Sequence, residues 1–422
     1  MRILVIGSGG REHALVWRLA QGPGEHELLC APGNAGISQL AECVPLDVED
    51  LDGLARFAQE RAVDLTVVGP ERPLILGIVD EFRARGLAVF GPSKAAAQLE
   101  GSKVFTDGLL ERHGVSRKRF AAFDDPGEAA AYVRAQGAPI VVKADGDALG
   151  KGVTVAATVE EALQAIDECL VQKLHGRAGE RIVIEECLVG PEVSVKVLTD
   201  GEDLVLLPPA QDHKRIGEGD TGPNTGGMGC YSPVPGVDRA LLDRIVEDLV
   251  RPTIRAMAAE GMPYTGCLYA GVILTPDGPE LLEYNCRFGD PETQVVLPRL
   301  GGDFAAALLA ASQGRLVEVD LPWRDEACVC VVVASGGYPG SYQKGKAIRG
   351  VEAAEGVEGV TVFHAGTALK DGVLCTNGGR VLGVTGLGPD LRATVARTYQ
   401  AVGRIDFEGA YYRRDIAHRA LV

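Results

Sequence analysis

Short apolar runs alternate with helix-patterned segments over the first hundred residues. The apolar runs are RILVIG, HELLCAPG and DLTVVGPE, and the helical segments between them are REHALVWRLAQ and LDGLARFAQERA. Strands buried on both faces are apolar throughout, and parallel neighbours need a helical crossover between them. The alternation predicts an α/β domain over residues 1–102, with a doubly wound parallel sheet that binds ligands at the carboxyl ends of its strands.

The turn after the first strand, GSGGRE, resembles part of a dinucleotide-binding fingerprint. Gly7 and Gly9 fit two of its glycines, but Glu12 stands at the third position, where a side chain obstructs close helix–strand packing. The second strand runs into APG and offers no acidic residue to a ribose. We therefore expect no nicotinamide cofactor. The turn suits a phosphate or carboxylate at a helix amino terminus, or it is a plain tight turn.

Composition narrows the function classes. The 422 residues are 46% hydrophobic, so several domains are expected, and the net charge of -16 argues against a nucleic-acid or anionic-membrane surface. No apolar stretch approaches the roughly 18 residues of a spanning helix. The ten cysteines are scattered without a CxxC pair, as expected for buried thiols in a reducing compartment. These features predict a cytoplasmic protein that binds neither nucleic acid nor membrane.

The stretch APIVVKADGDALGKGVTVAAT predicts a glycine-rich loop between two strands. It is not a Walker A motif, because the glycines are too close together, Gly152 follows Lys151, and a β-branched strand comes next. Such a loop can fold over phosphates as a flap, with Lys143 placing a cation beneath them. A simple glycine-rich hairpin is the alternative.

Two further strands end in carboxylates. RIVIEECLVGPE carries a glutamate pair at its strand end and Glu192 after a turn, which suits an adenine edge and ribose hydroxyls, although solvated charges explain it equally. In GVILTPDGPELLEYNCRFGDPETQ, the turn PDG predicts a hairpin. Glu283, Asn285 and Arg287 then share one strand face, opposite Tyr284. Carboxylate and amide oxygens suit Mg²⁺, and the arginine suits a phosphoryl group; an exposed polar face is the alternative.

Residues 212–229, DHKRIGEGDTGPNTGGMG, are too rich in glycine for a helix or a central strand. They predict a long loop, and such loops are functional or disordered. The block from about residue 325 to 422 contains several strands and one or two helices, including DLRATVARTYQAVGRI. We expect a small, mainly structural α/β domain in which NGGR is a tight turn.

Taken together, these segments resemble the phosphoribosylamine–glycine ligase family of the ATP-grasp superfamily. The ordered motifs run from residue 4 to residue 294 as GSGGREHAL, APGNAG, VGPE, KADG, GKGV, IEE, QDHKR, DTGPNTGGMG, YSP and NCRFGDPETQ, and continue as ASGGYPG, FHAGT and TNGGRVL. The resemblance implies an amino-terminal Rossmann-like domain (1–102), a central ATP-grasp domain (103–315, with a flap subdomain at about 120–190) and a small carboxyl-terminal domain (325–422).

The activity implied by the resemblance is ATP-dependent ligation of glycine to 5-phosphoribosylamine through a glycyl phosphate, within purine biosynthesis. ATP is then a co-substrate, and Mg²⁺ or Mn²⁺ is the metal. Glycine and 5-phosphoribosylamine are the other small-molecule partners. We expect a monomer that contacts neighbouring pathway enzymes at most transiently. The 212–229 loop becomes a functional closure that excludes water from the intermediate.

The resemblance also carries roles to individual residues. The implied ATP-binding residues are Lys103, Lys143, the flap residues Gly146, Gly150, Lys151 and Gly152, the adenine neighbours Glu185, Glu186 and Leu188, and Glu192 on the ribose. The implied metal ligands are Glu283 and Asn285, and the residues at the reacting groups are Arg287, Asp290 and Asp212, the last as acceptor of the glycine ammonium. The implied substrate-binding residues are Gly9, Gly10, Arg11, Asn34, Glu71, Asp212, His213, Lys214 and Arg287, with Arg215 facing phosphate.

Some positions depart from the family pattern. Asp147 adds a negative charge to the flap, Arg177 stands where an aspartate is common, and the position of a second metal ligand falls near Gly271. Two rival functions stay open at this stage. One is another ATP-grasp ligase or a purine-pathway carboxylase component, and the other is a non-catalytic nucleotide-binding protein.

Overall fold

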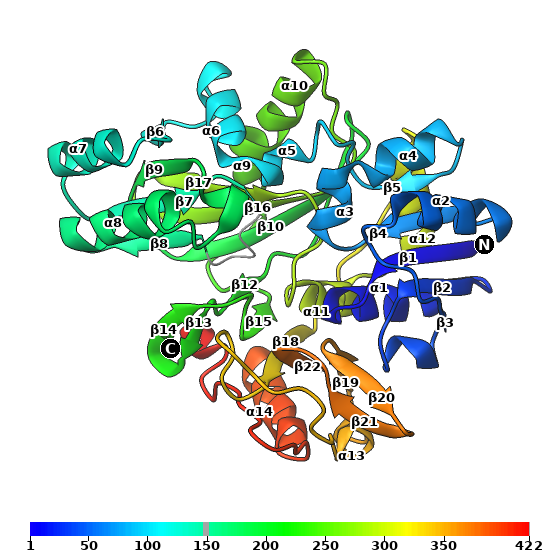
Figure 1. Ribbon diagram of the computed structural model, residues 1–422. Helices are drawn as coiled ribbons and strands as arrows, with labels where there is room; N and C mark the ends of the chain where they lie inside the picture. Colours follow the sequence, from blue (N-terminus) through cyan, green and yellow to red (C-terminus); the bar gives the residue numbers. More distant parts are fainter. Residues whose placement is uncertain (147–151, 422) are drawn as a thin grey trace.

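The computed structural model describes residues 1–146 and 152–421. Figure 1 shows an amino-terminal α/β layer beside two central sheets, with a carboxyl-terminal α/β unit packed beneath both. The architecture is therefore α/β throughout, with the parallel sheet at the amino terminus.

The amino-terminal sheet is parallel and has the strand order β3-β2-β1-β4-β5. Because β1 lies in the middle and the order reverses there, the sheet is doubly wound, which confirms the prediction. Its strands are β1 (Arg2–Gly7), β2 (Glu27–Pro32), β3 (Glu42–Cys43), β4 (Leu65–Val68) and β5 (Val89–Phe90), and its helices are α1 (Gly10–Ala20), α2 (Leu51–Glu60), α3 (Glu71–Leu76) and α4 (Ile78–Ala84).

Glu12 does not obstruct the turn after β1, contrary to the expectation from sequence. Its side chain folds back and accepts a hydrogen bond from the Gly9 backbone N–H (2.6 Å), while Oε1 pairs with Arg11 Nε (2.5 Å). The room comes from Gly7 and Gly69, because a Cβ at either would lie within 2.5 Å of Glu12 atoms. A carboxylate of the chain itself thus fills the place where a dinucleotide fold holds a phosphate.

The Gly69→Ala substitution is therefore expected to destabilise the fold. The new Cβ would lie 2.1 Å from Glu12 Oε1, which cannot move freely because Arg11 and Gly9 hold the carboxylate. Overpacking of this kind typically costs about 1–3 kcal/mol, measured as a change in the free energy of unfolding in urea. The matched control is Gly403→Ala, where the nearest atom is 3.5 Å away. Equal stability of the two variants would contradict this account of the turn.

The first central sheet is antiparallel, with the order β6-β9-β7-β8, and α7 and α8 cover one face. The antiparallel pairing of β7 with β8 confirms that the glycine-rich segment joins two strands. The elements are β6 (Phe120–Phe123), α7 (Pro126–Gln136), β7 (Ile140–Ala144), β8 (Val153–Ala156), α8 (Val159–Ile166) and β9 (Ile182–Glu186).

The second central sheet has the order β11-β10-β16-β17 and packs against α5, α6, α9 and α10. The predicted hairpin is present as β16 and β17. A bulge at Leu282 separates the pairs Val272–Leu281 and Gly271–Glu283. The elements are α5 (Gln98–Gly101), α6 (Lys103–Arg112), β10 (Glu192–Thr199), β11 (Leu204–Leu206), α9 (Arg239–Ile245), α10 (Arg251–Ala259), β16 (Gly266–Thr275), β17 (Gly278–Asn285), α11 (Thr293–Val296) and α12 (Phe304–Ser312).

The carboxyl-terminal sheet has the order β12-β15-β18-β22-β19, and α14 packs on it. The segment 212–229 is thus more ordered than a loop, because β12 and β15 at its ends join this sheet and β13 and β14 pair as a ribbon. The elements are β12 (Gln211–Asp212), β13 (Arg215–Gly217), β14 (Thr221–Asn224), β15 (Gly229–Ser232), β18 (Ala327–Ala334), α13 (Val351–Glu355), β19 (Val360–His364), β20 (Thr367–Lys370), β21 (Val373–Thr376), β22 (Arg380–Gly388) and α14 (Leu391–Val402).

The composition led to expectations about the cysteines and about membrane-spanning helices. All ten cysteines are free thiols, and all but Cys43 and Cys187 are buried. Among residues 1–146 and 152–421, no helix combines the length and apolar character needed to cross a membrane.

Candidate active site

A cavity of about 930 Å³ lies where the parts of the chain meet. Arg11 and Glu71 come to it from the amino-terminal layer, Lys143 and Glu283 from the two central sheets, and Arg380 from β22. One cavity therefore gathers residues that are far apart in the sequence.

Lysines line the side of the cavity formed by β7 and β9. Lys143 Nζ pairs with Glu185 Oε2 (2.8 Å) and donates to the Leu282 carbonyl oxygen (3.0 Å), which the β17 bulge exposes. Lys118 Nζ also pairs with Glu185 (2.7 Å). Burial alone would raise the pKa of Glu185, but the two lysines lower it to about 2. This wall is a buried, cationic surface.

Lys103 is the first residue of helix α6, which begins at the same wall. The preceding Ser102 caps the helix, and Asp145, just after β7, accepts hydrogen bonds from Ser102 Oγ (3.0 Å) and the Val104 N–H (3.1 Å). The lysine-bearing helix start is thus tied to the end of the strand that carries Lys143. Both lysines line the cavity.

Glu283 and Asn285 are two residues apart on β17, and both line the cavity. Burial would raise the pKa of Glu283, but Lys214, Lys143 and Lys103 hold it below its usual value, so the carboxylate is ionised. An ionised carboxylate and an amide oxygen are suitable ligands for Mg²⁺, which shares its remaining positions with water and phosphate.

The position near Gly271 supplies no second protein ligand. Gly271 lies directly across from Glu283 on β16, and a Cβ there would touch Glu283 Cγ at 3.4 Å. Among the residues that the structure describes, no group of three His, Cys, Asp or Glu side chains is placed to hold a metal. A metal at Glu283 and Asn285 would take further ligands from water or from a substrate.

Arg287 is held between acidic groups. Its guanidinium contacts Glu100 (2.8 Å), Glu71 (3.3 Å) and Asn285 Oδ1 (3.0 Å). Burial opposes the charge, yet Glu100 and Glu71 raise the pKa of Arg287 above its usual value. The side chain is thus a cation held in place beside Asn285.

Asp290 joins three parts of the chain. Its carboxylate accepts from the Arg11 backbone N–H (3.1 Å) and from Gln294 Nε2 (2.9 Å), and it pairs with Arg380 Nη1 (3.4 Å). Arg380 Nη1 also donates to the Asp290 carbonyl oxygen (2.8 Å) and to the Gly226 carbonyl oxygen. Arg380 therefore connects Asp290 to the glycine-rich segment 212–229.

Asp212 and Lys214 approach the cavity from the glycine-rich segment. Lys214 Nζ pairs with Glu192 Oε2 (2.7 Å). Burial raises the pKa of Asp212 to about 7, with Glu292 and Glu192 adding to the effect and Lys214 opposing it. A carboxyl group that titrates near neutrality in a cavity is a candidate for binding a cationic group.

The structure brings most of the predicted site residues to this cavity, but not all of them. The lining includes Lys103, Lys143, Gly146, Gly152, Glu185, Glu186, Leu188, Glu192, Arg11, Glu71, Asp212, Lys214, Arg215, Glu283, Asn285, Arg287 and Asp290. Asn34 instead donates to the carbonyl oxygens of Ser8 and His364 (2.8 Å each), and the His213 side chain is fully buried against the carboxyl-terminal segment. Gly150, Lys151 and Asp147 lie outside the described residues.

Gly9 and Gly10 lie at the start of α1 beside Asp290. A Cβ at Gly10 would meet Gln294 Nε2 at 2.6 Å, and one at Gly9 would lie 3.5 Å from Asp290 Oδ2. Gly10 therefore permits close approach of α1 to the 290–294 segment, whereas the contact that a Cβ at Gly9 would make with Asp290 is an ordinary one.

Sequence reasoning missed several residues of the cavity. Glu292, Glu100 and Lys118 line it, and so do Tyr338, Arg380 and Arg419 from the carboxyl-terminal block. The view of that block as mainly structural, with NGGR a plain turn, is corrected by the position of Arg380. The motif NGGR could have indicated this role of Arg380, because glycines beside an arginine leave room for its side chain to extend across a turn.

The paired antiparallel sheets, with lysines at one wall and a Glu-x-Asn strand at the other, are the features of an ATP-grasp protein. The family model described as phosphoribosylglycinamide synthetase, ATP-grasp (A) domain, matches residues 101–293, and the N and C domain models of the same family match residues 1–100 and 328–419. The chain belongs to the phosphoribosylglycinamide synthetase family.

Relatives of known name agree with this assignment. The chain is 52% identical to the phosphoribosylamine–glycine ligase of Vibrio parahaemolyticus and 51% identical to that of Brucella melitensis, covering 100% of this chain and 99% and 98% of the relatives. The crystal structure of the Thermotoga maritima phosphoribosylamine–glycine ligase superposes with a TM-score of 0.87 at 35% identity, over 99% of this chain and 100% of that one. A biotin carboxylase from Campylobacter jejuni, at 14% identity and a TM-score of 0.71, shares the fold.

Proposed function

We propose that this chain joins glycine to 5-phosphoribosylamine at the cost of ATP, releasing glycinamide ribonucleotide, ADP and phosphate. The observation that carries the proposal is that one cavity is lined both by Lys103, Lys143, Glu283 and Asn285 and by Asp212. The first set suits a nucleoside triphosphate with its metal, and Asp212 suits an ammonium group. Family membership supports the identity of the substrates.

The reaction requires activation of a carboxylate, because oxide is a poor leaving group. A carboxylate oxygen of glycine attacks the γ-phosphorus of ATP, the bond to the β,γ-bridging oxygen breaks, and ADP leaves with that electron pair. The amine of phosphoribosylamine then attacks the acyl carbon of glycyl phosphate, phosphate departs, and the amine proton passes to solvent or phosphate. The protein contributes positioning, charge neutralisation and exclusion of water.

Lys103 and Lys143 are proposed to neutralise the ATP phosphates at the cationic wall. The end of β9, with Glu185, Glu186 and Leu188, is proposed to border the adenine, and the segment from Gly146 to Gly152, between β7 and β8, to cover the phosphates. Support comes from their common place in the cavity lining, to which Gly150 and Lys151 are added by sequence alone.

Glu283 and Asn285 are proposed to hold Mg²⁺ or Mn²⁺. When bound, the metal would neutralise charge on the phosphate oxygens. Arg287, fixed by Glu100 and Glu71, is proposed to bind the transferring phosphoryl group, and Asp290 to lie beside it.

Asp212 is proposed to accept the glycine ammonium, and Lys214 to pair with anionic substrate groups when these displace Glu192. Gly9, Gly10, Arg11, Asn34, Glu71 and His213 were assigned to substrate binding by resemblance. Of these, Arg11 and Glu71 are supported as direct contacts by the cavity lining. Gly9, Gly10, Asn34 and His213 are instead proposed to hold neighbouring parts of the site in place. The basis is their hydrogen bonds and close approaches to other protein groups, described above.

The proposed domain boundaries are 1–102, 103–315 and 325–422, with a flap subdomain at about 120–190. The amino-terminal sheet and the two central sheets each lie within one of the first two ranges, whereas β12 and β15 of the central range pair with the carboxyl-terminal sheet. We also propose that the chain acts in the cytoplasm as a monomer. Light scattering of the purified protein tests the last point, since a mass of twice the 44.4 kDa chain would contradict it.

The experiment that tests the proposed function is release of ADP as a function of substrate. Rapid release is expected only when glycine and phosphoribosylamine are both present with ATP and Mg²⁺. Release driven by bicarbonate with an imidazole ribonucleotide would indicate the carboxylase alternative. Tight ATP binding without turnover under any condition would indicate a nucleotide-binding protein.

Arg380→Met is expected to lower kcat about ten- to a hundredfold with little change in the KM for ATP, because about 1.5–3 kcal/mol is lost with a charged hydrogen bond. Arg380 holds Asp290 and Gly226, and neither belongs to the lysine wall. Arg392→Met, an exposed arginine on α14, is the matched control. Equal kinetics of the two variants would show that β22 contributes nothing to turnover.

A further inference from the structure

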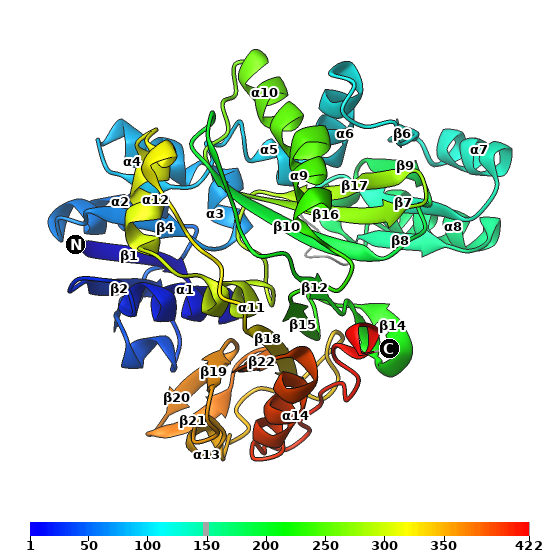
Figure 2. The ribbon, with the colours of Figure 1, turned by 180° about the vertical axis from the view of Figure 1, so that it is seen from behind.

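The carboxyl-terminal segment Tyr411–Arg419 lies against the glycine-rich segment that carries Asp212 and Lys214. Figures 1 and 2 show the end of the chain, in red, beside β13 and β14, almost two hundred residues earlier in the sequence. Three hydrogen bonds between side chains and backbone groups join the two segments. Tyr411 Oη donates to the Ile216 carbonyl oxygen (2.8 Å), the Ala417 N–H donates to His213 Nε2 (2.9 Å), and Arg419 Nη1 donates to the Asp212 carbonyl oxygen (3.1 Å).

Asp220, in the turn between β13 and β14, is the centre of this contact. Its Oδ1 accepts from Arg413 Nη1 (2.9 Å), and its Oδ2 pairs with Arg419 Nη2 (2.7 Å). The backbone of Asp220 is left-handed (φ +57), which aspartate tolerates in a tight turn. Two arginines of the carboxyl-terminal segment thus hold the tip of the ribbon.

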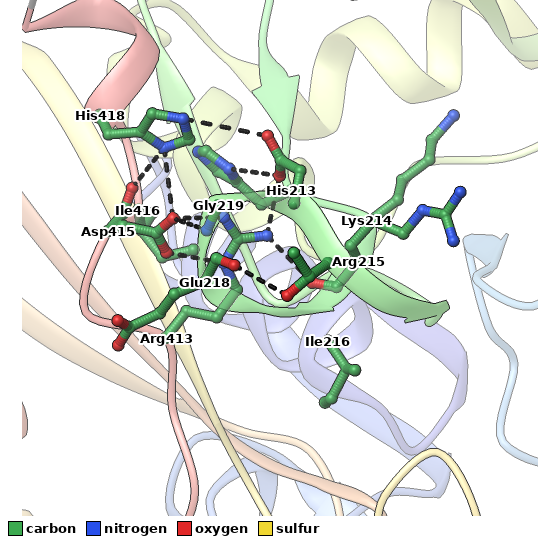
Figure 3. A network of polar contacts seen from close by, with 12 residues as sticks. His213, Lys214, Arg215, Ile216, Glu218, Gly219, Arg413, Asp415, Ile416 and His418 are labelled. Carbon is green, nitrogen blue, oxygen red and sulfur yellow. Dashed lines mark hydrogen bonds and ion pairs between the residues drawn. The ribbon is translucent and has the colours of Figure 1, made fainter.

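Arg413 is fully buried, and each of its donor groups has a partner (Figure 3). It pairs in a bidentate manner with Asp415 (2.8 and 2.7 Å), and it donates to the Arg215 carbonyl oxygen (3.0 Å). Asp415 in turn accepts from the Gly219 backbone N–H (2.8 Å). A buried, fully paired arginine fixes its neighbours closely, because any movement leaves charge unpaired in a low-dielectric region.

His213 links the carboxyl-terminal segment to Asp212 and Lys214, its neighbours in the chain, which line the cavity. Side chains alternate along an extended chain, so His213 points towards the carboxyl-terminal segment while Asp212 and Lys214 point the other way. Figure 3 shows the Lys214 side chain directed away from Asp415 and His418. Burial lowers the pKa of His213 to about 3, so the ring is neutral, and its Nε2 acts as the acceptor for Ala417.

We propose that Arg413 and Arg419 are positioning residues that hold the segment 212–220 so that Asp212 and Lys214 face the substrates. The glycines of the segment give it little stiffness of its own, so its geometry must come from outside. The inference rests on the proposed function, in which Asp212 binds the glycine ammonium. It adds a role for a part of the chain that lies outside the ATP-binding sheets.

The test compares four variants of the full chain. Arg413→Met removes the buried charge, and Arg413→Lys restores the charge without the bidentate geometry. Asp415→Asn keeps the side-chain shape and weakens the pair, which makes it the milder variant if Arg413→Met does not fold. Arg414→Met is the matched control, because this neighbouring arginine is exposed. Kinetics with varied glycine and varied ATP are combined with amide hydrogen exchange over residues 212–217.

In Arg413→Met and Asp415→Asn we expect kcat/KM for glycine to fall, by roughly tenfold to a hundredfold in Arg413→Met, as for a small misplacement of a binding group. The KM for ATP stays unchanged, Arg413→Lys recovers part of the loss, and amides 212–217 exchange faster than in Arg414→Met. Unchanged exchange would overturn the contact, and faster exchange with unchanged glycine kinetics would overturn the positioning role. Absence of glycine-dependent turnover in the wild type would instead contradict the proposed function, and hydrogen exchange would then decide whether the segment is held.

Discussion

Glu283→Gln is expected to abolish most turnover while leaving the fold intact. The substitution keeps the shape of the side chain but removes the charge that Lys143, Lys103 and Lys214 surround. Loss of one preorganised electrostatic group typically costs about 10²–10³ in kcat, and loss of a metal ligand adds to this. The measurement is kcat at increasing Mg²⁺, where a partial recovery at high metal concentration indicates weakened metal binding.

The matched control for this variant is Glu280→Gln. Glu280 lies on the same strand, β17, but outside the cavity lining, so its kinetics should match the wild type. Near-normal turnover of Glu283→Gln at ordinary Mg²⁺ would remove the metal assignment. A loss of similar size in Glu280→Gln would show that the strand, and not the ligand, is responsible.

Asp212→Asn is expected to damage the use of glycine far more than the binding of ATP. Loss of a hydrogen bond to a charged group costs about 1.5–3 kcal/mol, so kcat/KM for glycine should fall roughly ten- to a hundredfold. Asp277→Asn, in the exposed turn between β16 and β17, serves as the control. If Asp212→Asn weakened only ATP binding, the carboxylate would belong to the nucleotide site.

The pH dependence of the same parameter gives an independent check on Asp212. Its pKa is raised to about 7 by burial and by Glu292 and Glu192, against Lys214 and Arg419. Below that pH the carboxyl group is protonated and cannot pair as an anion with the glycine ammonium. Therefore kcat/KM for glycine should rise with pH through about 7 and then level, and this inflection should be absent in Asp212→Asn. A flat wild-type profile between pH 6 and 8 would contradict the assignment.

Local sequence patterns predicted much of the fold. The apolar runs of the first hundred residues form the doubly wound sheet, and the PDG turn forms the β16–β17 hairpin with Glu283 and Asn285 on one face. These features follow from period and turn chemistry within a few residues. The strands on both sides of residues 146–152 were predicted for the same reason.

Features that depend on distant parts of the chain could not be predicted in this way. Glu12 fits its turn only because Gly69, at the end of β4, leaves room for it. Arg380 reaches Asp290 because β22 lies beside the central domain, and His213 turns away from the cavity because Ala417 holds its ring. The 212–229 segment contains strands because of partners far along the chain. Strand β18, about a hundred residues later, pairs with β15, and Tyr411, about two hundred residues later, hydrogen-bonds to Ile216.

The most direct test of the central claim is transfer of oxygen from glycine to phosphate. The enzyme is supplied with ATP, Mg²⁺, phosphoribosylamine and glycine labelled with ¹⁸O in its carboxylate, and the released phosphate is analysed by mass spectrometry. If glycyl phosphate forms by attack of the carboxylate on the γ-phosphorus, each phosphate carries one ¹⁸O atom, and its release requires glycine. Unlabelled phosphate, or phosphate released at the same rate without glycine, would contradict the proposed reaction.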